Sequence, residues 1–153
     1  MMTGFAIFIL VGISLIGLFT GPRYYLVWNL SMIIMPLAML IVAIFFIIRG
    51  YVITGDTLVV LRPGWSSKVD LNGLESVEAD PRAMANSIRT FGNGGLFCYA
   101  GSFRNKKLGP YRAFATDQKR SVILRFSGHT VVVTPEKPED FVSKLKEIRK
   151  LNQ

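Results

Sequence analysis

The sequence predicts a two-helix transmembrane hairpin followed by a mainly-β domain of about seven strands that ends in an α-helix. Three observations lead to this fold class. The chain has 153 residues, and only one charged residue, Arg23, lies among the first 48. From residue 51 onward, short runs of β-branched and aromatic residues alternate with glycine, proline and aspartate turns. Residues 138–151 have the apolar spacing of an amphipathic helix.

Two uncharged segments, residues 2–19 and 26–48, form the predicted hairpin. As α-helices they would be about 27 and 34 Å long, close to the thickness of the bilayer hydrocarbon. Gly21 and Pro22 interrupt the chain between them. The first segment lacks the charged start and the small-residue cleavage site of a secretory signal peptide. We therefore expect two spans within residues 1–49, and a separate domain over residues 50–153.

The basic residues beside the spans predict the orientation. Arg49 and a basic domain follow the second span, whereas the connection between the spans holds only Arg23. The positive-inside rule then places the domain and the N-terminus in the cytoplasm, with the protein integral to the cytoplasmic (inner or plasma) membrane. A lone cysteine, Cys98, excludes an intrachain disulfide and is compatible with a reducing compartment.

Several elements of the domain are clear from the pattern. A hairpin is expected at residues 51–61, a half-buried strand at 74–79, and a second hairpin at 121–134. Asp80 and Pro81 predict the start of a one- or two-turn helix over residues 82–87. In the helix at 138–151, acidic residues occupy the first turn and basic residues the end. We expect this helix to cover the open end of a sandwich or partly open barrel.

The residue inventory argues against an enzyme. The single histidine, His129, lies in a predicted turn, and Cys98 lies between two aromatic residues. One histidine and one cysteine cannot supply a typical zinc site, and nothing nearby in the sequence activates the thiol. The glycines at 92–95 match neither nucleotide-binding glycine motif in full, so we interpret them as a structural turn that needs positive φ angles, or as a bulge. We expect no catalytic residue, no metal and no cofactor.

Positive charge is concentrated in the middle of the domain. Residues 82–125 hold nine basic residues against one acidic residue, Asp117. These side chains could be simply solvated, could face anionic lipid head groups at about 1 kcal/mol each, or could bind an acidic or strand-like segment of a partner protein. The membrane segments argue against a nucleic-acid partner. The candidate contacts, with 104–107 expected at a loop tip, are Arg89, Arg104, Lys106, Lys107, Arg112, Lys119 and Arg120.

The middle of the domain also carries a family resemblance. The relevant segments are RTFGNGGLF at 89–97, FRNK at 103–106, LG at 108–109, YRAFATD at 111–117, KRSVILR at 119–125 and VVVTP at 131–135. From residue 51 the chain resembles the membrane-tethered bacterial PH-like (pleckstrin-homology-like) domain proteins. The resemblance implies a barrel of seven strands with a C-terminal helix, and it implies no particular ligand or activity.

We therefore expect a non-enzymatic scaffold at the membrane surface that binds another protein or anionic phospholipid head groups. Two alternatives remain open. The protein could be an accessory subunit of a larger membrane complex, with the helices as its interface. A membrane-bound enzyme is the third and least favoured class.

Overall fold

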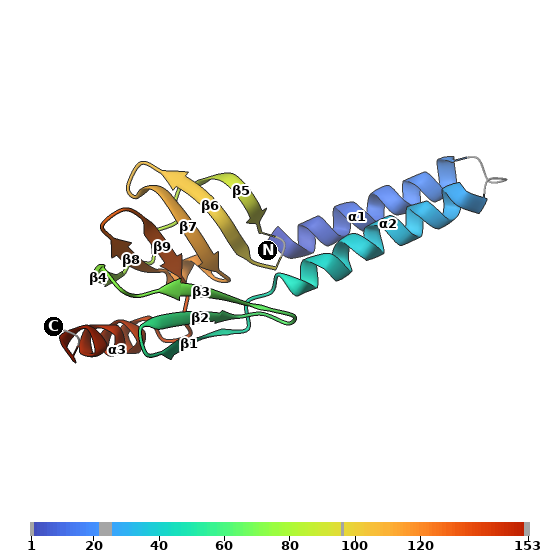
Figure 1. Ribbon diagram of the computed structural model, residues 1–153. Helices are drawn as coiled ribbons and strands as arrows, with labels where there is room; N and C mark the ends of the chain where they lie inside the picture. The colour runs from blue at the N-terminus through green and yellow to red at the C-terminus, as the bar shows by residue number, and fades with distance from the viewer. Residues whose placement is uncertain (1, 22–25, 96, 152–153) are drawn as a thin grey trace.

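The computed structural model describes residues 2–21, 26–95 and 97–151 (Figure 1). Helices α1 (Met2–Thr20) and α2 (Leu26–Phe45) run side by side in opposite directions and project from one end of a β-rich domain. The start of α1 and the end of α2 both lie at the domain (Figure 1). The connection predicted at residues 22–25 lies outside the described residues.

The two helices present apolar side chains on nearly all sides. Their few polar groups bond within the hairpin: Ser14 Oγ donates to Leu10 O at 2.8 Å, and Trp28 Nε1 donates to Gly17 O of the other helix at 3.1 Å. Among the described residues, α2 is long and apolar enough to cross a membrane, and α1 contributes a shorter apolar stretch, Ile7–Thr20. The structure thus contains both predicted helices, of which one meets the length and composition of a span.

Helix α2 ends at Phe45, three residues before the predicted end at 48. The reason is that the next residues are drawn into the domain. Phe46 packs its ring edge-on against Trp65 with the ring centroids 5.2 Å apart, and Ile48 is buried in the main core. Arg49 N then donates to Leu61 O at 2.8 Å, which starts the first sheet.

The domain contains two sheets. A three-stranded antiparallel sheet has the order β1-β2-β3, and a six-stranded sheet has the order β4-β8-β9-β7-β6-β5, in which β7 and β9 are parallel. The strands are β1 (Gly50–Thr54), β2 (Thr57–Leu61), β3 (Ser66–Asp70), β4 (Leu74–Ala79), β5 (Ile88–Gly94), β6 (Tyr99–Asn105), β7 (Gly109–Ala115), β8 (Val122–Phe126) and β9 (Thr130–Val133). A 3₁₀ turn, η1 (Gln118–Arg120), joins β7 to β8.

The described residues therefore form nine strands where about seven were expected, and the two sheets do not close into a barrel. The runs on either side of Arg62-Pro63-Gly64 pair with each other as β2 and β3, and β5 pairs with β6. Strands β3 and β5 are each at an edge of their sheet. A gap between the two sheets consequently remains on that side of the domain.

The core lies on both faces of the six-stranded sheet. One face packs against the three-stranded sheet and helix α3 (Pro138–Leu151), whose Val142 and Leu145 are buried. The other face is covered by the segment between β4 and β5, through buried Ala83 and Met84. Helix α3 has the predicted bounds, and it packs on the core beside β4 and leaves the open side between β3 and β5 uncovered.

Two local predictions need correction. Residues 82–87 form turns and no helix. Asp80 still caps this segment, since its Oδ1 accepts from Arg82 N at 3.0 Å. Gly92 and Gly94, expected in a turn, belong to β5, next to a bulge between Arg89 and Phe91. The positive φ angles expected of these glycines do occur, at +99° for Gly92 and +133° for Gly95.

The Tyr51 hydroxyl joins the two sheets. It donates to Phe114 O at 2.6 Å and accepts from Thr134 N at 3.1 Å. Burial raises the pKa of Tyr51, so the hydroxyl stays protonated at neutral pH. We predict that Tyr51→Phe lowers the free energy of unfolding by about 1–3 kcal/mol, because a buried N–H and a buried carbonyl lose their partner. Thermal or urea unfolding measures this loss. Tyr99→Phe is the control, since the Tyr99 hydroxyl bonds no described residue, and an equal loss in both variants would contradict the prediction.

Gly92 and Gly101 face each other across β5 and β6. Gly101 has a φ of +143°, and a Cβ there would lie 2.2 Å from Phe91 O. We predict that Gly101→Ala detaches β5 from the sheet and costs at least about 1–3 kcal/mol, the range for strained backbone at such angles. Faster amide hydrogen exchange in β5 would report this. Gly128→Ala is the matched control, because a Cβ at Gly128 meets nothing within 4 Å. Unchanged exchange in β5 of Gly101→Ala would sink the idea.

Candidate functional site

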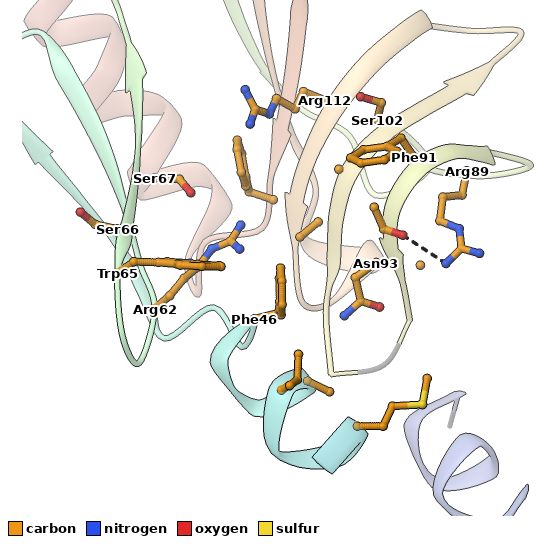
Figure 2. Close-up of a pocket in the computed structure, with 18 residues that line it drawn as sticks. Phe46, Arg62, Trp65, Ser66, Ser67, Arg89, Phe91, Asn93, Ser102 and Arg112 are labelled. Atoms are coloured by element: carbon orange, nitrogen blue, oxygen red, sulfur yellow. Dashed lines mark hydrogen bonds between the residues drawn. The ribbon is translucent and has the colours of Figure 1, made fainter. Parts of the chain in front are cut away.

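The gap between the sheets contains a cleft of about 1010 Å³ beside the end of α2 (Figure 2). Its walls come from α2, from the β2–β3 hairpin, and from β5, β6 and β7. Small residues on β5 and β6 keep it open, since no side chain from Gly92 or Gly101 fills the space. The lining residues are Met39, Val42, Ala43, Phe46, Arg62, Trp65, Ser66, Ser67, Arg89, Phe91, Gly92, Asn93, Gly94, Ala100, Gly101, Ser102, Arg112 and Phe114.

Arg62 lies inside this cleft among aromatic rings. It precedes the Pro63-Gly64 turn, and its N–H donates to Trp65 O at 3.1 Å, which fixes the hairpin. Its guanidinium carbon lies 6.0 Å from the ring centroid of Phe46, 5.8 Å from that of Trp65 and 5.5 Å from that of Phe114. The Nε atom is buried and has no hydrogen-bond partner among the described residues.

Arg112, on β7, approaches the ring of Phe114, which also lies beside Arg62. Residues 112 and 114 lie on one face of the strand because side chains alternate along it, and the Arg112 guanidinium carbon is 5.1 Å from the Phe114 centroid. Burial lowers the pKa of Arg62, and the positive charge of Arg112 lowers it further. Both groups nonetheless stay cationic, because arginine is not deprotonated in proteins. Figure 2 shows the two side chains extending into the cleft from opposite walls.

Among the described residues, no carboxylate lies in the cleft beside these arginines. The cleft is lined by three arginines and by no aspartate or glutamate. Ion pairs are formed by Lys107 with Asp80, Arg120 with Asp117, and Lys137 with Asp140, and none of these lies in the cleft. A guanidinium offers forked N–H donors that suit phosphate and carboxylate groups. The arrangement can therefore hold an anionic group that has apolar surface beside it.

The structure separates the seven predicted contact residues into three groups. Arg112 and Arg89 belong to the cleft lining. Arg89 is at its margin: its side chain lies on the outer side of β5 (Figure 2), where its Nη1 donates to Gly92 O at 3.2 Å. Arg104, Lys106 and Lys107 lie at the β6–β7 turn, at the end of the domain away from α1 and α2 (Figure 1). Lys119 and Arg120 belong to η1.

Two of the predicted contact residues outside the cleft, Lys107 and Arg120, form ion pairs. Lys107 Nζ bonds Asp80 Oδ2 at 2.5 Å, and this hydrogen bond lowers the pKa of Asp80. The Arg120 Nε atom bonds Asp117 Oδ2 at 3.1 Å. The loop tip at 104–107 forms as expected, and contact of these side chains with lipid or a partner stays a prediction.

No local sequence pattern marks Arg62, Phe46 or Trp65 as site residues. Arg62 precedes a Pro-Gly pair, and Phe46 lies near the end of the apolar segment 26–48. One sequence signal was available: Arg62 and Trp65 flank a Pro-Gly turn within 20 residues of the end of α2. That they meet residues 112 and 114 depends on how the two sheets stack.

Cys98 is buried in the core, and His129 lies in a turn as predicted. Cys98 is 1% exposed, and its thiol donates to Phe46 O at 3.0 Å. Burial raises the pKa of this thiol, which keeps it in the unreactive form at neutral pH. His129 is exposed in the β8–β9 turn and stacks on Phe126 at 4.5 Å. The part of the chain that the structure describes holds no group of three His, Cys, Asp or Glu side chains that could bind a metal.

The comparison with known families matches the domain defined by the two sheets and α3. The family model of the bacterial PH domain matches residues 49–148. No curated protein and no solved structure matches the chain significantly. The match begins where α2 has ended and runs nearly to the end of α3, so it includes every strand of the cleft. Since it covers well over half of the sequence, the chain belongs to the bacterial PH domain family.

Proposed function

We propose that this protein is a membrane-anchored, non-enzymatic binding module that holds an anionic ligand in the cleft between its sheets. Helices α1 and α2 cross the membrane as a hairpin and keep the PH domain at the cytoplasmic surface. The observation that carries the proposal is the pair Arg62 and Arg112, which share an aromatic, partly desolvated cleft without any carboxylate.

The membrane anchor is supported by the surface of the hairpin. Large apolar side chains such as Phe8, Ile16, Val27 and Met35 are between 64% and 79% exposed, which is unfavourable in water and normal in lipid. Because both helices have their domain-side ends together, the N-terminus and the PH domain share one side of the membrane (Figure 1). Arg49 and the positive charge of the domain favour the cytoplasmic side.

The ligand class is supported by the free-energy cost of holding two guanidinium groups in this cleft. A buried polar group without a partner costs free energy, and two like charges near one ring repel each other. An anion placed between the guanidinium groups would accept hydrogen bonds from them and offset the repulsion. Charge-assisted hydrogen bonds of this kind contribute about 1.5–3 kcal/mol each.

The topology gives one prediction. Single cysteines introduced by Thr20→Cys, at the far end of α1, and Gly128→Cys, in the β8–β9 turn, should react differently with a membrane-impermeant maleimide. We expect labelling at residue 20 in intact cells, and at residue 128 only after permeabilisation. The native Cys98 thiol is buried and sets the baseline. Labelling of residue 128 in intact cells would show the opposite orientation, and equal labelling of both sites would contradict a membrane span between them.

The cleft gives another prediction. In neutral detergent, pyrophosphate should raise the melting temperature of the full chain, because a ligand at a hundredfold excess over its Kd stabilises by about 2.7 kcal/mol. Arg62→Gln and Arg112→Gln should abolish most of this shift. Lys146→Gln on α3 removes the same charge from an exposed site outside the cleft and should keep it. A shift of equal size in all four proteins would argue against the cleft as the anion site.

A further inference from the structure

We infer that the ligand of the cleft is a single anionic phospholipid, with its charged head group between Arg62 and Arg112 and its hydrocarbon along α2. This inference rests on the proposed function, because it names the class of ligand for the same cleft. It is carried by three features of the cleft: an apolar stripe on α2, a charged inner end, and an aromatic mouth.

The apolar stripe belongs to the last turns of α2. The lining residues Met39, Val42, Ala43 and Phe46 have the spacing i, i+3, i+4, i+7, which is one face of a helix. At 1.5 Å per residue the stripe is about 10 Å long. Met39 and Val42 are 57% and 58% exposed, whereas Ala43 is buried. The stripe therefore runs from the lipid-facing part of the helix into the cleft.

The charged end of the cleft adjoins the end of this stripe that is nearer the domain. Phe46 is its last residue, and the Arg62 guanidinium carbon is 6.0 Å from the Phe46 ring. Moving along α2 toward the domain, the wall of the cleft changes from methionine and valine to an aromatic ring and then to two guanidinium groups. This order, from apolar to cationic, is the complement of a lipid acyl chain joined to a phosphate.

The mouth of the cleft carries exposed aromatic side chains on both sides. Trp65, from the β2–β3 hairpin, is 51% exposed, and Phe91, on β5, is 79% exposed (Figure 2). Aromatic residues of this kind concentrate at the membrane–water interface. With α2 crossing the membrane, Trp65 would sit near the level where a lipid leaves its leaflet to enter the cleft, whereas Phe91 lies farther from α2, beside Ser102 (Figure 2).

An acidic peptide strand is the competing occupant, since β3 and β5 are sheet edges. The edge of β5 is poorly suited to a further strand. It is bulged between Arg89 and Phe91, Gly92 has a φ of +99°, and Gly92 O already accepts from Arg89 Nη1. Strand β3 carries Lys68 at its centre. Bulges and lysines are the features by which edge strands avoid pairing.

The test uses Trp65 as the reporter. The chain has two tryptophans, so Trp28→Phe leaves Trp65 alone. The full chain in nanodiscs of neutral phosphatidylcholine receives small fractions of phosphatidylglycerol brominated near the head of its acyl chains, because bromine quenches tryptophan on contact. We expect saturable quenching, stronger than that by brominated phosphatidylcholine at the same fraction.

Three variants in this background locate the lipid. Arg62→Gln and Arg112→Gln should each weaken the apparent affinity about tenfold or more, the effect of losing one charge-assisted hydrogen bond. Lys146→Gln should keep the affinity of the parent protein. Arg112 is exposed, so its variant is expected to fold even if the half-buried Arg62 proves sensitive. Thermal unfolding of each variant checks that it is folded.

The remaining outcomes separate the two proposals. Quenching that is equal for anionic and neutral brominated lipid, or equal in all variants, overturns the inference that the ligand is a phospholipid. If pyrophosphate still stabilises the protein in an Arg62-dependent manner, the proposed anion-binding cleft stands without a phospholipid ligand. If a soluble oligoglutamate peptide shifts the Trp65 emission in neutral nanodiscs and the shift needs Arg62, the occupant is an acidic peptide. If no probe depends on Arg62 or Arg112, both proposals fall.

Discussion

The seating of residues 46–48 in the domain is the constraint on which the rest of the structure depends. Phe46 leaves α2 and packs against Trp65, its carbonyl accepts from the Cys98 thiol, and Ile48 enters the core. These contacts attach the helix to both sheets within three residues, so no flexible linker separates the apolar hairpin from the PH domain. As a result, the last turns of α2 become one wall of the cleft, and whatever position the helix takes in a membrane also fixes the position of the cleft.

The same junction explains why the sheets meet on one side only. Tyr51 lies just after it and bonds both Phe114 O and Thr134 N, which holds β1 against the six-stranded sheet. On the other side, β3 and β5 would have to approach each other to close a barrel. Arg62, Trp65 and the end of α2 occupy the space between them, and a guanidinium there cannot be buried against a second sheet without a partner. The open edge is thus a consequence of a charged side chain placed between two layers.

The sequence predicted the parts of this protein whose signals are local. The apolar hairpin, the bounds of α3, the β8–β9 hairpin at Ser127-Gly128-His129 and the positive φ angles of the glycines follow from periodicity, turn residues and backbone sterics. Two predictions were wrong: that the second helix continues to residue 48, and that residues 82–87 are helical. Both errors have the same origin, since tertiary packing overrides local preference and cannot be seen in a single sequence. The cleft was missed for the same reason, since its five walls come from segments up to 75 residues apart, Met39 to Phe114.

Arg62 and Arg112 suit the proposed binding site, but they lower the stability of the fold. A methionine at 62 could fill the aromatic cage without an unpartnered donor, and a neutral residue at 112 would remove the repulsion near Phe114. Cation–π contacts return only about 0.5–1 kcal/mol each at partly exposed sites, a part of what the desolvated charges cost. Local rules that are broken in a well-packed domain commonly mark a functional site. Here the broken rule is specific: positive charge is held in an apolar cleft beside the end of α2, while the other clustered cations, at 104–107 and 119–120, pair with carboxylates or stay in solvent. The position of this charge, more than the total charge of the chain, is therefore what supports the proposed binding role of the space between the sheets.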